Sequence, residues 1–113
     1  MLTKDSILQV KDTPYINVEI PEWGGNAFVK TLTGAERLRL EADISQDAKT
    51  NGPALTRVVC ATLCDEQGRL LFDYPKDIDA LNTKSVKVLH RLFDVALKVN
   101  ALSSKDVDEL EKN

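Results

Sequence analysis

Three side chains could bind a metal or undergo redox chemistry: Cys60, Cys64 and His90. The two cysteines are four positions apart in a segment with helical character, so their thiols share one face. Structural zinc needs four ligands, and the nearest further candidate, Asp65, lies only at the end of that segment. Disulfide frameworks of small domains use more cysteines at wider spacing. We therefore expect two buried free thiols, and we expect His90 at the surface of its helix.

The other candidate for cation binding is an acidic group near the end of the sequence: Asp106, Asp108, Glu109 and Glu111. This group lacks the D-x-D-x-D-G spacing of a calcium loop, and acidic residues are common where a helix begins. Gly24 and Gly25 lack the spaced glycines and the Lys-Ser/Thr pair of a phosphate loop. We therefore predict that the protein is not an enzyme and uses no metal and no cofactor.

Composition points the same way. The chain has 113 residues, of which 15 are basic and 18 acidic, with a formal charge of −3. Proteins that bind nucleic-acid backbones usually carry a basic excess, so we expect no nucleic-acid partner. The longest apolar stretch, residues 58–64, has about seven residues where a membrane span needs ~20, so we expect no membrane partner. The length fits one domain, residues 1–113.

The pattern near the N-terminus predicts a β-hairpin over residues 15–32. Apolar side chains alternate along residues 15–20, which is typical of a half-buried strand. Pro21 restricts φ and the glycines at 24 and 25 permit positive φ, which predicts a turn. A lone hairpin is unstable in water, so it must pack on helices or on another chain.

The rest of the sequence is mainly helical. Thr33 and Glu36 have the spacing of a capping box, which places a helix start there. Polar residues over 45–53 indicate a loop. The predicted fold is mainly α (α+β): a small helical domain in which the hairpin packs against about four to five helices, with a helical core over 33–100. The predicted helices cover residues 3–10, 33–44, 53–64, 75–81, 85–100 and a short acidic 103–113.

Two of these helices have more apolar surface than a surface helix usually shows. In helix 33–44, Leu40 and Ile44 lie nearly opposite a second stripe, so this helix is either sandwiched between layers or presents a face to a partner. That second stripe consists of Ala35, Leu38 and Ala42. In helix 85–100 the apolar side chains cover an arc of roughly 200°, about twice the ~100° of an ordinary stripe. This helix is either wrapped by the domain or meets another subunit.

Trp23 is a further candidate because it sits in the predicted turn. An indole there offers a large anchor for a partner, or it folds back onto its own strands. The candidate partner-binding residues are therefore Trp23, Leu40, Ile44, Val88, Leu92 and Val95. For the helical residues, a place in the core is the alternative.

An ordered series of short motifs runs through the chain, and each motif alone is common in proteins. The motifs are VEIPEWGG at 18–25, VKTLTGAER at 29–37, LCDEQG at 63–68 followed by Leu71-Phe72, LFDVA at 92–96 and NALS at 100–103. Together, in this order and spacing, they resemble the tail assembly chaperones of long-tailed, siphovirus-type bacteriophages, over about residues 3 to 113.

The resemblance implies a small, mainly helical protein of the host bacterial cytoplasm that is absent from the mature virion. It implies binding to the tape measure protein, which is kept soluble, and recruitment of tail tube subunits. Many such families make a longer form by ribosomal frameshifting near the end of the reading frame, with which Lys112-Asn113 is compatible. Self-association into a ring or spiral would follow from head-to-tail contacts. The alternative is a minor phage tail completion or connector protein.

Overall fold

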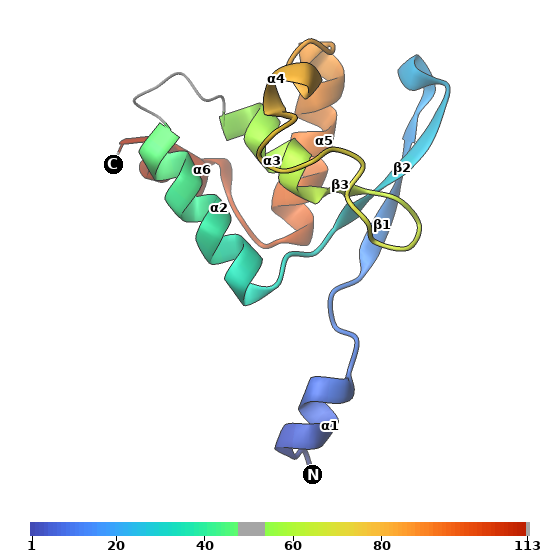
Figure 1. The fold of residues 1–113 in the computed structure, drawn as a ribbon, viewed down its shortest axis with the longest axis vertical. Coiled ribbons are helices and arrows are strands. Elements are labelled where there is room, and N and C mark those ends of the chain that lie inside the picture. Colours follow the sequence, from blue (N-terminus) through green and yellow to red (C-terminus); the bar gives the residue numbers. More distant parts are fainter. Residues whose placement is uncertain (48–53, 113) are drawn as a thin grey trace.

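The computed structural model describes residues 1–47 and 54–112 (Figure 1). Within these ranges it has six helices and a three-stranded sheet near the N-terminus, so the predicted mainly helical α+β class is confirmed. The predicted start of helix 53–64 at Pro53, and the loop residues 48–53, lie outside the described residues. The helices are α1 (Lys4–Gln9), α2 (Gly34–Asp47), α3 (Ala54–Thr62), α4 (Ile78–Leu81), α5 (Val86–Val99) and α6 (Ser104–Lys112).

The predicted hairpin is confirmed. Strands β1 (Tyr15–Ile20) and β2 (Gly25–Lys30) pair antiparallel, with Val18 opposite Ala27. A short 3₁₀ turn, η1 (Pro21–Trp23), joins them and ends at Gly24, whose φ of 77° favours glycine. The local residue choices of this turn therefore fix the register of the whole hairpin.

The third strand lies where the sequence predicted the end of helix 53–64. Strand β3 (Leu63–Cys64) pairs antiparallel with β2, so helix α3 ends two residues before the predicted end at Cys64. The Thr62 hydroxyl donates to the Val58 carbonyl at 2.8 Å, a bond that competes with the helical ladder at this end. The backbone that follows satisfies the second edge of β2, and Leu63 is buried there.

The core lies between the sheet and the helices. Every described side chain of α3 except Leu55 is buried, as expected for the central helix. Helix α5 packs against α3 and against the hairpin, whereas α2 packs against α3 and α6 (Figure 1). The predicted capping box holds the start of α2: the Glu36 N–H donates to Thr33 Oγ1 at 3.2 Å and Thr33 N–H to Glu36 Oε1 at 2.9 Å.

Asn100 joins the hairpin to the helices. Its side chain is buried at the end of α5. The Asn100 Oδ1 atom accepts from the Leu32 N–H at 2.7 Å, while Nδ2 donates to the carbonyls of Lys30 at 3.2 Å and Ala96 at 3.0 Å. One amide group therefore satisfies backbone groups from the segment after β2 and from α5, which fixes the sheet relative to the helices.

Candidate partner-binding surface

Four of the six predicted partner-binding residues lie in the core. The side chains of Leu40, Ile44, Val88 and Leu92 are between 1 and 3 % exposed and belong to one continuous apolar cluster. The alternative in which they present spare surface to a partner is therefore wrong for the folded chain, and the core alternative holds. The physical reason is that α5 lies between α3 and the hairpin, so that the domain itself covers its wide apolar arc.

On α2 one apolar stripe is buried and the other is exposed. Leu40 and Ile44 face the core, where α2 packs against α3 and α6. Leu38 is 70 % exposed, and Ala35 and Ala42 are also exposed. Helix α2 is thus covered on one side by the described residues, and its uncovered stripe is the one opposite the predicted pair.

The other two predicted residues lie nearer the surface. Val95 is partly buried and packs against the core. Trp23 is also partly buried and packs against the core, but it lines a groove as well. The indole packs against the core, which fits the alternative in which it folds back, and it also lines the groove. Its role as an anchor for a partner stays a prediction.

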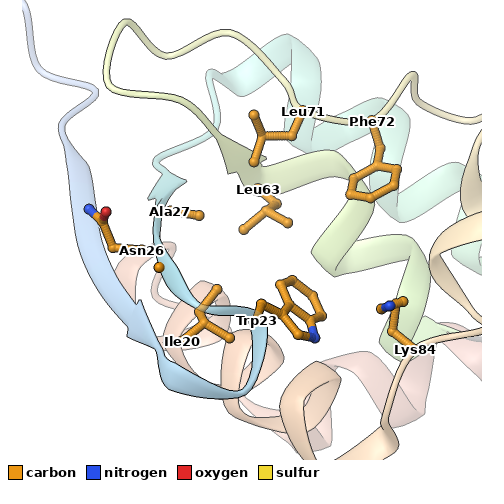
Figure 2. A pocket seen from close by; sticks show the side chains of 9 residues that line it. Ile20, Trp23, Asn26, Ala27, Leu63, Leu71, Phe72 and Lys84 are labelled. Atoms are coloured by element: carbon orange, nitrogen blue, oxygen red, sulfur yellow. The ribbon is translucent and has the colours of Figure 1, made fainter.

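The groove beside Trp23 has a volume of about 350 Å³ and is mainly apolar (Figure 2). Buried side chains of the sheet form its floor, and Trp23 and Phe72 face one another across it, with Lys84 beside the indole. Leu71 is 51 % exposed at the rim. The floor consists of Ile20, Ala27 and Leu63.

An ion pair holds the Trp23 side of the groove. Arg91 of α5 donates from Nη1 to Glu22 Oε1 at 2.7 Å and from Nη2 to Oε2. The hydrogen bonds from this guanidinium lower the pKa of Glu22 to about 2. Because Glu22 precedes Trp23 in η1, the pair fixes the turn, and with it the indole, against α5.

A tight turn holds the opposite side. Asp65 Oδ1 accepts from the backbone N–H groups of Gln67 at 2.8 Å and Arg69 at 3.0 Å. These bonds lower the pKa of the Asp65 carboxyl, with the Arg69 N–H making the largest contribution. The chain then returns along β3, where the Leu71 N–H donates to the Leu63 carbonyl at 3.1 Å. The turn therefore sets Leu71 and Phe72 beside the floor of the groove.

The groove can bind apolar side chains, and its residues carry no nucleophile and base at catalytic distance. Cys60 and Cys64 are buried free thiols, as predicted, and burial raises the pKa of Cys60 to about 11. The Cys60 thiol is therefore neutral at pH 7 and a poor nucleophile. His90 is exposed on α5, as expected.

The described residues offer neither a metal cluster nor a membrane-spanning helix. Residues 1–47 and 54–112 contain no cluster of three or more His, Cys, Asp or Glu side chains that could hold a metal ion. In the same ranges, none of the helices combines the length and apolar character needed to cross a membrane.

The sequence analysis missed Leu71 and Phe72 as surface residues. The sequence alone predicts a short apolar strand or an extended piece over residues 69–72, whereas the structure has a single bridge between Leu70 and Cys64 followed by an open turn. The sequence did contain a signal: Leu70, Leu71 and Phe72 are three consecutive apolar residues directly after a polar turn. A strand with all three side chains buried would need to be covered on both of its faces. The N-terminal segment was also missed as a surface feature.

Comparisons with known proteins support the sequence resemblance at the level of the fold. No protein-family model matches the sequence, and no curated protein matches it. Among solved structures, the tail assembly chaperone of bacteriophage HK97 is similar, with a TM-score of 0.60 and 22 % sequence identity. The likeness covers 84 % of this chain and 94 % of that one. The two chains therefore share a fold over nearly their whole lengths.

Proposed function

We propose that this protein is a bacteriophage tail assembly chaperone that binds the tape measure protein and keeps it soluble during tail assembly. The observation that carries the proposal is the fold shared with the HK97 chaperone over most of both chains. The motif series over residues 3 to 113 supports the same family. In the proposal the protein acts in the host cytoplasm, helps recruit tail tube subunits and is left out of the virion.

The physical task is to cover apolar helical surface reversibly. A long helical protein whose apolar faces lack their partner aggregates through those faces. An amphipathic helix can lay its apolar side into a hydrophobic groove, with anchors one helical turn apart. The groove beside Trp23 has the size and apolar lining for such anchors. Trp23 supplies a large, rigid contact surface of the kind that dominates binding energy.

Weak binding at each groove is sufficient for this task. When several copies bind along one rod, each further contact is intramolecular, and the total affinity far exceeds that of one copy. Release remains possible because each groove dissociates separately. This reasoning favours a small protein that associates with itself into a ring or spiral, and it requires no enzyme activity.

The test is co-expression with the tape measure protein encoded beside this gene, measuring the soluble fraction of the tape measure protein. We expect the wild type to raise that fraction severalfold and Leu71→Asp to lose most of the gain, because a carboxylate would enter the apolar groove. Leu38→Asp is the matched control, since Leu38 is exposed on α2 and no residue of α2 lines the groove. An insoluble tape measure protein with the wild type present would contradict the proposal.

Purified particles provide a second test. A chaperone in this role is absent from finished particles, whereas a tail completion or connector protein is present at a fixed number of copies per particle. Mass spectrometry of purified virions therefore separates the two. Mass measurement of the products of the native gene tests for a longer frameshifted form, because the unshifted product has a mass of 12.6 kDa.

A further inference from the structure

Helix α1 contributes no residue to the core of the described part of the chain. None of its residues is buried, and Ile7 and Leu8 are 54 % and 72 % exposed. Figure 1 shows α1 separated from the body at the end of an extended segment. A helix of six residues is not stable alone in water. The apolar surface of α1 therefore indicates a partner that the isolated chain does not supply.

The sequence nevertheless defines this helix. Thr3 and Ser6 form a reciprocal cap, with the Thr3 N–H donating to Ser6 Oγ at 2.9 Å and the Ser6 N–H to Thr3 Oγ1 at 3.2 Å. Lys4 lies on the same face as Ile7 and Leu8, which follow it by three and four positions. The exposed face of α1 thus combines two aliphatic side chains with a positive charge, and Lys11 lies two residues after the end of the helix.

A complementary surface lies among the helices of the body. A second groove of about 380 Å³ runs between the start of α3, the middle of α5 and α6. Its walls include Leu55 and Phe93, and two exposed carboxylates on α6, Asp108 and Glu111, lie at its edge. Within the described residues, neither carboxylate forms an ion pair, nor does either Lys4 or Lys11.

The N-terminal arm, residues 1–14, leaves the body on the side away from this groove. The Pro14 carbonyl accepts from the Thr31 N–H at 3.0 Å and from Thr31 Oγ1 at 2.8 Å, which fixes the last residue of the arm to the hairpin. In Figure 1, α1 lies at one end of the long axis, and α3, α5 and α6 lie in the other half of the molecule. Helix α1, with its apolar and basic side chains, and the groove, with its apolar and acidic side chains, therefore lie in different halves of the molecule.

From this arrangement we propose that α1 of one copy docks into the α3–α5–α6 groove of a second copy. Ile7 and Leu8 enter the apolar part of the groove, and Lys4 and Lys11 meet Asp108 and Glu111 at its edge. The contact joins unlike surfaces, so each added copy exposes a free helix and a free groove, which generates a ring or an open spiral. The inference deepens the proposed function and rests on its self-association, but it leaves the groove beside Trp23 free for the tape measure protein.

Charge exchange tests the contact on the full-length protein. Sedimentation at about 50 mM salt would measure self-association of the wild type, of Lys4→Glu/Lys11→Glu and of Asp108→Lys/Glu111→Lys. We expect each double variant to weaken association at least tenfold, and we expect the protein carrying all four changes to associate within about threefold of the wild type, because the ion pairs are restored with reversed sign. Lys76→Glu, an exposed change outside both surfaces, should leave association unchanged.

Three results would overturn the inference: a wild type that stays monomeric at millimolar concentration, double variants that associate normally, or a variant with all four changes that does not recover self-association. Loss of association in Leu71→Asp with intact charge variants would place α1 in the groove beside Trp23 and would also overturn it. Failure of association with normal tape measure solubility removes this inference alone. Failure of tape measure solubility with normal association removes the proposed function alone.

Discussion

Helices α1 and α5 both carry apolar residues at helical spacing, yet the structure treats them in opposite ways. On α5, Val88 and Leu92 are buried between α3 and the hairpin, whereas no residue of α1 is buried. The difference lies in how each helix is joined to the rest of the chain. Helix α5 is joined to α4 by a turn of four residues, 82–85. Helix α1 is instead separated from the hairpin by an extended segment that ends at Pro14.

This contrast relocates the apolar surface available to partners. The sequence predicted it on α2 and α5, but the described chain covers the predicted faces of both helices with its own core. The large apolar side chains that remain exposed gather at the periphery instead. They lie on residues 1–10, at the start of the hairpin, and at Leu38, Leu70, Leu71 and Val86.

The largest effect is expected from substitutions that test whether the Leu40 and Ile44 side of α2 belongs to the core. We expect Leu40→Asp/Ile44→Asp to prevent folding, because each change buries a carboxylate without a partner. Leu38→Asp on the opposite stripe should change the free energy of unfolding by no more than about 0.5 kcal/mol. Urea unfolding followed by circular dichroism measures both. A folded double variant that has lost only self-association would reverse the assignment.

Local features of the fold were predictable from the sequence because their causes are local. The capping box at Thr33 and Glu36 and the turn ending at Gly24 each depend on a few adjacent residues, and both are confirmed. Strand β3 was not predictable, because Leu63 and Cys64 continue the apolar run of α3. Only the open edge of β2, more than thirty residues earlier, draws them into the sheet.

The candidate groove was predictable in one residue only. Trp23 stood out because an indole in a turn is unusual, and it does line the groove. The remaining lining comes from distant segments, around Ala27, Leu63, Phe72 and Lys84, that only tertiary structure brings together. The spacing of apolar residues along α2 could not show which of its two stripes is buried, because that depends on where α3 and α6 lie.

A smaller effect is expected where the hairpin meets α5. Asn100→Leu removes the acceptor of the Leu32 N–H and the donor to the Lys30 carbonyl. Leaving such buried groups unsatisfied costs about 1–3 kcal/mol, so we expect that decrease in the free energy of unfolding by urea. Gln46→Leu, at an exposed position of α2, is the comparison. Equal effects of the two changes would show that Asn100 does not connect sheet and helices.

The ion pair beside Trp23 should give a modest, pH-dependent effect. The pKa of Glu22 is lowered from 4.5 to about 2 in the folded protein by its hydrogen bonds with Arg91. A lowered pKa stabilises the fold fully above pH 4.5, and this contribution is lost as the pH falls from 4.5 toward 2. Glu22→Gln should therefore be less stable than the wild type at pH 7, with the difference shrinking over that interval. A difference that is constant with pH would exclude this pair as its source.

The smallest effect on stability is expected where the contrast between α1 and α5 is sharpest. Because no residue of α1 is buried, deletion of residues 1–10 should leave the free energy of unfolding of dilute protein unchanged within about 0.5 kcal/mol. The same deletion should abolish concentration-dependent self-association. Hydrogen exchange distinguishes the states directly: amides of α1 should exchange freely in dilute protein and become protected as concentration rises, while those of α5 stay protected throughout. Protection of α1 that is independent of concentration would mean that the helix docks on its own chain.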